Sequence, residues 1–106
     1  MTKYKAIRTE VDGITFASRR EANRYKELKF LRSQYRISDL VLQPKFPVEV
    51  CGKKICTYVA DFMYYENGNQ IIEDVKGVKT PVYRIKKKLV EAIYNITIKE
   101  VWWLSI

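Results

Sequence analysis

Residues 58–76 read YVADFMYYENGNQIIEDVK, and this stretch decides the fold. Asn67-Gly68 stands near its centre, between two runs rich in aromatic and β-branched residues. That pattern is typical of a β-hairpin with a two-residue turn. Such a turn fixes which residues face each other along the two strands, and the predicted register places Asp61 opposite Asp74.

The same register predicts a site. It pairs Val59 with Lys76, and because side chains alternate between faces, Asp61, Asp74 and Lys76 share one face. Facing carboxylates repel each other, but a divalent cation between them removes the repulsion, since hard cations are bound by oxygen ligands. We therefore expect a metal site with Lys76 in reach of its water or of a phosphate. The alternative is an exposed pair of aspartates that Lys76 partly neutralises.

Glu73 is a second acid beside Asp74. It points to the other face of the strand, opposite Phe62, and only Asp74 has the Asp-x-Lys spacing that shares a face with Lys76. A salt bridge to a basic residue is the role we expect for Glu73.

A helix is predicted upstream, from Ser18 to about residue 32, because Ala22, Tyr25 and Leu28 recur along one side of it. Glu21 has two competing roles there. Ser18 and Glu21 fit a capping box, in which the Glu21 carboxylate bonds back to the Ser18 backbone. Glu21 also borders the buried face, from which it would help to hold a metal or its water.

The rest of the chain predicts an α+β fold in a single domain, residues 1–106. Asp12-Gly13 favours a small hairpin over residues 9–16, and Thr80-Pro81 is a typical helix start. Extended segments are expected at 39–50, 54–65, 70–76 and 96–103, giving a mixed sheet of about four strands flanked by two helices. The second helix is expected to end at Asn95 and to turn four residues to the core: Val82, Ile85, Leu89 and Ile93.

The charge is unevenly distributed over the 106 residues, whose net charge is +8. Residues 1–36 carry ten basic and four acidic side chains, and residues 77–94 carry five basic and one acidic. Residues 37–76 between them carry four basic and six acidic. Basic flanks attract a polyanion, although a solubilising surface accounts for charge alone. An acidic centre between basic flanks suits a metal-dependent nucleic-acid enzyme.

Composition also excludes several classes of protein. The chain has no His, which excludes imidazole-dependent triads and His-metal nucleases. No charge-free run reaches the roughly 18 apolar residues that a membrane span needs, so no membrane partner is expected. Two cysteines without a secretory signal predict a reducing, cytoplasmic location.

These residues resemble the PD-(D/E)XK nuclease superfamily, whose signature is an acid on one hairpin strand, an acid-x-Lys on the next and a helical Glu upstream. The matching segments are 58–62 (YVADF) and 73–77 (EDVKG), with Glu21 upstream and residues 42–46 (LQPKF) similar to a Gln-Pro segment of small members. Ala60 replaces the nominal Pro of the motif. More closely, the chain resembles a phage-borne family of small proteins catalogued as a domain of unknown function, through residues 12–16 (DGITF) and 74–80 (DVKGVKT).

The resemblance implies a restriction-endonuclease-like core and a DNA endonuclease that uses Mg²⁺ (or Mn²⁺). Asp61, Asp74 and the backbone carbonyl of Val75 would bind the metal. Lys76 would orient or activate the attacking water, and Glu21 would support a second metal or that water. The residues expected to bind the DNA backbone are basic: Arg19, Arg20, Arg24, Lys45, Lys79, Arg84, Lys86, Lys87 and Lys88.

The first functional hypothesis is a homodimeric, structure-selective endonuclease that acts on branched DNA, similar to Holliday-junction resolvases, in the cytoplasm of the bacterial host if the protein is phage-encoded. A second is a nuclease of other specificity, for nicking, end-processing or transposase-like cleavage. A third is a non-catalytic DNA-binding phage accessory protein.

Overall fold

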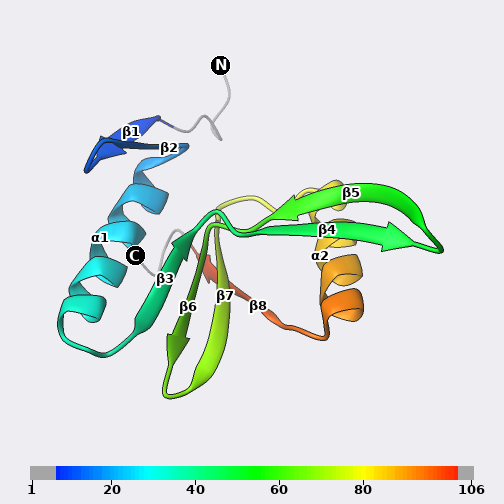
Figure 1. Ribbon diagram of the computed structural model, residues 1–106. Coiled ribbons are helices and arrows are strands. Elements are labelled where there is room, and N and C mark those ends of the chain that lie inside the picture. The colour runs from blue at the N-terminus through cyan, green and yellow to red at the C-terminus, as the bar shows by residue number, and fades with distance from the viewer. Residues whose placement is uncertain (1–6, 103–106) are drawn as a thin grey trace.

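A mixed four-stranded sheet forms the centre of the computed structural model, which describes residues 7–102. Its strand order is β3-β6-β7-β8, with antiparallel pairing throughout except for the parallel pair β7 and β8 (Figure 1). The strands are β3 (Ser38–Leu42), β6 (Phe62–Glu66), β7 (Asn69–Lys76) and β8 (Ile98–Trp102). The predicted strand over 96–103 thus begins two residues later, and Trp103 lies outside the described residues.

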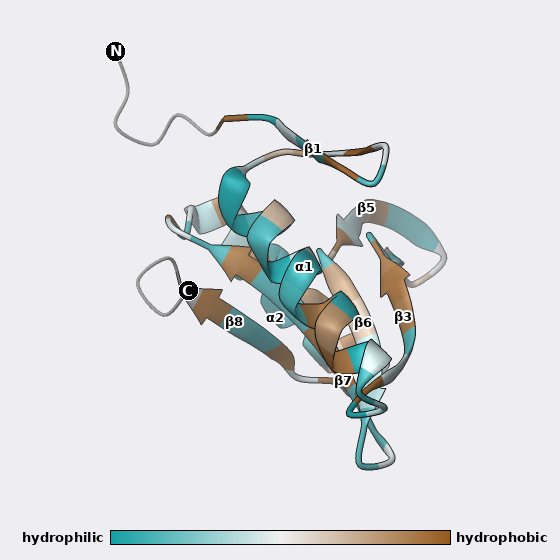
Figure 2. Ribbon diagram, turned by 90° about the vertical axis from the view of Figure 1, so that its left-hand side faces the viewer, coloured by the Kyte–Doolittle hydropathy of each residue, from teal (hydrophilic) through white to brown (hydrophobic). Residues whose placement is uncertain are grey.

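Two helices, α1 (Arg19–Ser33) and α2 (Pro81–Tyr94), cover opposite faces of this sheet. On the α1 side, Leu28 packs against Phe62 and Tyr64, and Figure 2 shows α1 crossing this face with hydrophobic residues of β3 and β8 behind it. On the α2 side, Val90 packs against Ile72 and Ile98. The predicted α+β architecture, with a four-stranded mixed sheet, two helices and an N-terminal hairpin, is confirmed. None of the helices within residues 7–102 is long and apolar enough to cross a membrane.

The turn at Asn67-Gly68 forms as predicted. Both residues have positive φ, 52° and 78°, as a tight hairpin turn with the twist of the strands requires. The register is also confirmed from this turn down to Phe62, which pairs with Glu73.

Below Phe62 the predicted register is wrong, because residues 54–65 are two strands. β5 (Lys53–Val59) leaves the central sheet and pairs with β4 (Lys45–Val50), so Val59 faces Lys45 and not Lys76. The expected extended segment 39–50 breaks at the same level, into β3 and β4.

The two breaks are joined by hydrogen bonds. The Gln43 N–H donates to the Asp61 carbonyl at 3.0 Å, and the Ala60 N–H donates to the Pro44 carbonyl at 3.1 Å. Gln43 has a φ of 51°, which ends regular strand geometry, and Pro44 has no N–H to donate to a ladder. The segment after β3 and the segment before β6 therefore leave the central sheet together.

A second hairpin, β1 (Thr9–Val11) and β2 (Ile14–Phe16), forms around Asp12-Gly13 as predicted. Phe16 is buried beside Tyr25 of α1, with ring centroids 5.0 Å apart.

The expected core face of α2 is wrong at three of its four residues, whereas Leu89 packs against the core as predicted. Val82 and Ile85 are 62% and 61% exposed, and Ile93 is 45% exposed. Val90 is the buried residue of the helix, with Tyr83 and Leu89 partly buried beside it. The cap predictions hold, since the Thr80 hydroxyl accepts from the Tyr83 N–H and Asn95 is left-handed.

Candidate active site

Asp61 and Asp74 meet where the hairpin ladder ends. Asp61 occupies the break before β6, and its N–H donates to Oδ1 of Asp74 at 3.0 Å. In return, the Val75 N–H donates to Oδ2 of Asp61 at 2.7 Å. The carboxylate of each aspartate is thus held by a backbone N–H group of the segment that contains the other aspartate. The structure brings the two predicted acids together through this exchange rather than through the expected ladder pair.

Asp74 is 1% exposed. Burial raises the pKa of its carboxyl group to about 6, against the lowering effect of Lys76 and of the Asp61 N–H. The Tyr58 hydroxyl donates to Oδ2 of Asp74. No signal in the sequence indicates Tyr58. It precedes Asp61 by three residues, and in a straight strand the two side chains would point to opposite faces. The break in the strand after β5 turns the Tyr58 side chain toward Asp74.

Glu21 lies on the first turn of α1, near Asp61 and Asp74. Its N–H donates to the Ser18 hydroxyl at 3.1 Å, so Ser18 caps the helix as predicted. Its carboxyl group, however, lies close enough to that of Asp61 for the two to interact. Burial, and then the charges of Asp61 and Asp74, raise the pKa of Glu21 to about 7. The pKa of Asp61 is also raised, mainly by burial.

Lys76 supplies the positive charge of the site. Its charge lowers the pKa of Glu21, of Asp61 and of Asp74, which places it within electrostatic reach of all three. Its Nζ lies 4.3 Å from the ring centroid of Tyr83, over the ring face. The ring holds the ammonium group beside the acids without neutralising it.

Glu73 forms the salt bridge that we predicted, and its partner is Arg24. Arg24 Nη2 donates to Oε2 of Glu73 at 3.0 Å, and the Tyr64 hydroxyl donates to the same oxygen at 2.6 Å. Arg24 also pairs with Glu27 at 3.2 Å. Since its guanidinium group is engaged in these ion pairs, we leave Arg24 out of the proposed DNA-contacting surface.

The other basic residues predicted to bind DNA are scattered over several elements. Lys79 forms an ion pair with Glu100 at 2.9 Å, and Lys87 lies 3.7 Å from Glu91 and 3.8 Å from Glu100. Lys86 lines a hollow beside Lys76. Arg20 is partly buried, and the exposed members of the set are Arg19, Lys45, Arg84 and Lys88.

The profile of a family described as "Protein of unknown function (DUF1064)" matches residues 1–105. The chain belongs to this family. A search among curated proteins finds no match.

A hard divalent cation fits the donors of the DUF1064 site. Asp61 and Asp74 offer oxygen atoms only. Burial raises the pKa of both carboxyl groups although Lys76 lowers it, so a further cation would favour their ionised forms. Within residues 7–102 no group of three or more His, Cys, Asp or Glu side chains is arranged to hold a metal ion. In this arrangement Glu21 is not the third member of a preassembled ligand set with Asp61 and Asp74.

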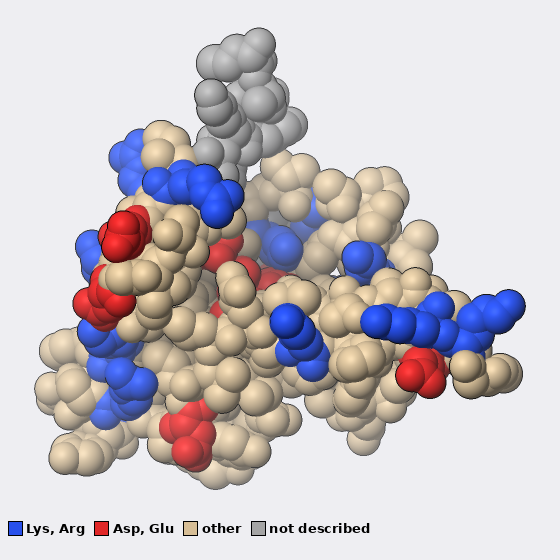
Figure 3. All heavy atoms as spheres, turned by 45° about the horizontal axis from the view of Figure 1, so that its top comes forward, with Lys and Arg blue, Asp and Glu red and all other residues tan. Residues whose placement is uncertain are grey.

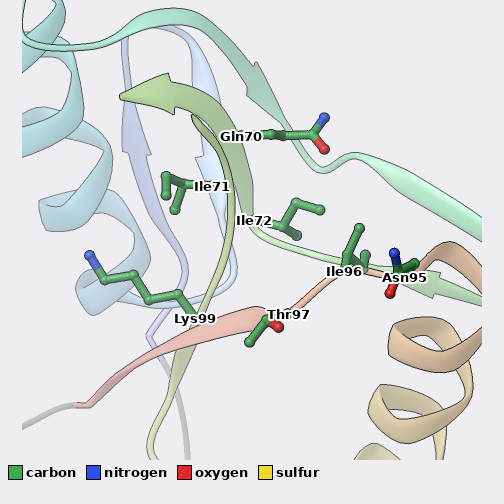
Figure 4. Close-up of a pocket in the computed structure, with 7 residues that line it drawn as sticks. All are labelled: Gln70, Ile71, Ile72, Asn95, Ile96, Thr97 and Lys99. Atoms are coloured by element: carbon green, nitrogen blue, oxygen red, sulfur yellow. The ribbon is translucent and has the colours of Figure 1, made fainter. Parts of the chain in front are cut away.

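A separate hollow of about 490 Å³ lies between the start of β7 and the residues that lead from α2 into β8 (Figure 4). Its lining contains no carboxylate, and Lys99 is its one charged residue. This hollow therefore has no carboxylate that could bind a metal ion, unlike the site of Asp61 and Asp74.

Proposed function

We propose that this protein is a Mg²⁺-dependent DNA endonuclease that hydrolyses phosphodiester bonds. The observation that carries the proposal is the interlocked pair of Asp74, which is buried, and Asp61, which is partly buried; the pKa of both carboxyl groups is raised, and one ammonium group accompanies them. A purely structural acid pair gains nothing from this arrangement, because burial of unbalanced negative charge costs free energy. A bound cation offsets that cost.

Each residue has a role in the proposed reaction. Asp61, Asp74 and the Val75 carbonyl would hold Mg²⁺ (or Mn²⁺), which would supply Lewis-acid stabilisation and a more acidic water. Lys76 stabilises the negative charge that grows on the phosphate as water attacks phosphorus. Glu21, with a pKa near 7, is suited to accept the proton of that water. The phosphorus–oxygen bond to the leaving strand then breaks, and that oxygen takes up a proton.

The charge distribution suits DNA as the substrate. Figure 3 shows acidic atoms recessed between α1 and the β4–β5 part of the molecule, with basic atoms on both sides. Among the predicted DNA-binding residues, Arg19 lies exposed at the start of α1, and Lys45 lies exposed on β4. Basic groups on both sides of an acidic site would bind the sugar-phosphate backbone while the scissile phosphate reaches the metal.

We propose branched DNA, such as a four-way junction, as the preferred substrate, with a homodimer as the active form, since a two-fold symmetric junction matches a two-fold dimer. The deciding experiment incubates the protein with a labelled four-way junction, a nicked duplex and a linear duplex, each with Mg²⁺, Mn²⁺ or EDTA. Sedimentation measures the oligomeric state in parallel.

The expected result is metal-dependent cleavage, fastest on the junction, that is lost in Asp74→Asn and Lys76→Ala. Asp39→Asn, which makes the same change at an exposed acid at the start of β3, is the matched control and should cleave like wild type. Cleavage that survives in Asp74→Asn would contradict the assigned site. Equal rates on junction and duplex would contradict the substrate preference and favour a nicking or end-processing nuclease.

A second candidate is DNA binding without cleavage. The absence, among residues 7–102, of three side chains arranged to hold a metal favours it. Binding of DNA with no metal-dependent cleavage of any substrate would establish this function in place of the nuclease.

A further inference from the structure

The hairpin of β4 and β5, residues 45–59, leaves the central sheet and projects from the molecule (Figure 1); we call it the arm. Its base is rigid. Val48 is fully buried, and the Phe46 ring packs edge-on against Tyr94 of α2 with centroids 5.3 Å apart. The Tyr94 hydroxyl donates to the Pro47 carbonyl at 2.7 Å. The arm is therefore held in a fixed direction by α2.

The arm begins at the candidate active site. β5 ends at Val59, and only Ala60 separates it from Asp61. A hollow of about 330 Å³ joins the two regions, since Thr57 and Val59 of β5 line it together with Lys76. Its other wall includes Lys86 of α2. A phosphate group in this hollow would thus lie beside two lysines and against the base of the arm.

Most exposed side chains of the arm are basic or aliphatic. Lys45, Lys53 and Lys54 are exposed, and Glu49 is the one acid among residues 45–59. Figure 3 shows basic atoms in a row along the arm, on the side of the molecule where the acids are recessed. The arm therefore carries a net charge of +2 and lies next to the candidate active site.

We propose that the arm lies in the major groove of duplex DNA next to the scissile phosphate, an inference that rests on the proposed function. A two-stranded β-ribbon fits this groove, about 12 Å wide. The arm's strands have six and seven residues, which span roughly 20 Å, or about six base pairs at 3.4 Å each. The substrate must then be double-stranded for about six base pairs on one side of the cleavage point.

The arm does not suit single-stranded DNA. Sequence-tolerant binding of single strands uses exposed aromatic rings on which bases stack. The two aromatic residues of the arm, Phe46 and Tyr58, face inward and pack against each other, with centroids 6.5 Å apart. The exposed positions of the arm hold no aromatic ring, so the duplex is the form of DNA that its surface matches.

The test compares a double variant at the tip, Lys53→Ala/Lys54→Ala, with a control of equal charge change, Arg32→Ala/Arg36→Ala. Arg32, in the last turn of α1, and Arg36, three residues after the helix ends, are both exposed and lie at the opposite end of α1 from Glu21. Fluorescence anisotropy in EDTA measures binding to a 20-base-pair duplex and to a 20-nucleotide single strand over a range of salt concentrations. All four substituted residues are exposed, and thermal melting checks that both variants fold.

We expect the slope of log affinity against log salt for the duplex to fall by about 2 in the tip variant, about 1 for each lysine. The control should keep the wild-type slope, and the tip variant should bind the single strand as the control does. Equal duplex binding by tip and control variants would overturn the inference, as would a larger loss on the single strand.

The cleavage assay separates this inference from the proposed function. If wild type cleaves DNA and the tip variant binds duplex normally, the arm is wrongly assigned and the nuclease stands. If the tip variant loses duplex binding while no protein cleaves, the arm binds duplex and the nuclease is wrong. Wild type that binds no duplex would overturn both.

Discussion

Glu73 and Asp74 are neighbours in β7 and are 0% and 1% exposed, yet their surroundings differ. Glu73 faces α1, where Arg24 and the Tyr64 hydroxyl balance its charge. Asp74 faces away from α1, accepts from the Tyr58 hydroxyl and from the Asp61 N–H, and has its pKa raised to about 6.

The comparison indicates that Glu73 has a structural role and that Asp74 has a functional one. A buried carboxylate with an ion-paired arginine is stable as it stands, and removal of one partner is costly. A buried carboxylate whose charge is disfavoured is under-compensated, and such groups gather at functional sites. Adjacent positions of one strand thus have opposite roles because the strand alternates between two differently charged surroundings.

The largest expected effect is on stability. Glu73→Gln leaves the Arg24 guanidinium without its carboxylate partner in the interior, which costs about 3–5 kcal/mol and lowers the melting temperature by at least about 12 °C. Circular dichroism melting measures it. The control is Glu27→Gln, because Glu27 pairs with Arg24 from a half-exposed position and contributes well under 1 kcal/mol. Equal melting temperatures for the two variants would contradict the structural role of Glu73.

The next effect is on activity. Asp74→Asn should lower the rate of Mg²⁺-dependent DNA cleavage at least about 100-fold, since the loss of a metal ligand exceeds the loss of its hydrogen-bonded neighbours. Its melting temperature in EDTA should stay within about 4 °C of wild type, because the amide removes a disfavoured charge. A drop as large as that of Glu73→Gln would show that Asp74 too is structural.

A smaller effect concerns pH in the absence of metal. Glu21 and Asp74 have folded-state pKa values of about 7 and about 6, above the ordinary values of 4.5 and 3.8. Between the ordinary and the folded-state values the folded state holds protons that the unfolded state has lost, so the contribution of these two groups to stability is fully present below their ordinary pKa values and is lost as the pH rises through 6 and 7.

After allowance for solvent screening, we expect about 1 kcal/mol between pH 5.5 and pH 8 in EDTA, or about 4–8 °C in melting temperature. Mg²⁺ should stabilise the protein more at pH 8 than at pH 5.5. Glu21→Gln should flatten the dependence. A melting temperature that rises with pH over this range would refute the unbalanced negative charge.

The smallest effect distinguishes two roles of the first turn of α1, the helix cap by Ser18 and the proposed catalytic role of the Glu21 carboxyl group. Ser18→Ala removes the cap on the Glu21 N–H and should cost about 1 kcal/mol of stability, with no change in the pH dependence. Glu21→Gln should lower cleavage while costing little stability. Thermal melts and cleavage rates of both variants measure the separation, and identical profiles for the two would show that Glu21 acts only at the cap.

Local sequence predicted much of the fold. The Asn67-Gly68 turn set the register as far as Phe62 and Glu73, and the spacing of Ala22, Tyr25 and Leu28 gave the buried face of α1. The failures lie in α2 and in β5. The apolar stripe from Val82 to Ile93 has helical spacing, but spacing alone does not say which side of a helix meets the sheet, and the sheet meets Val90.

The sequence by itself determined the hairpin turn, the helix caps and the presence of Asp61, Asp74 and Lys76 near the end of one hairpin, because turn geometry and alternation act over a few neighbouring residues. Only the tertiary structure decided that the chain breaks at Gln43 and Asp61, which sends the arm outward, turns Tyr58 to Asp74 and brings Glu21 to Asp61. Those contacts join segments distant in the chain, and their energies depend on burial that no local pattern encodes.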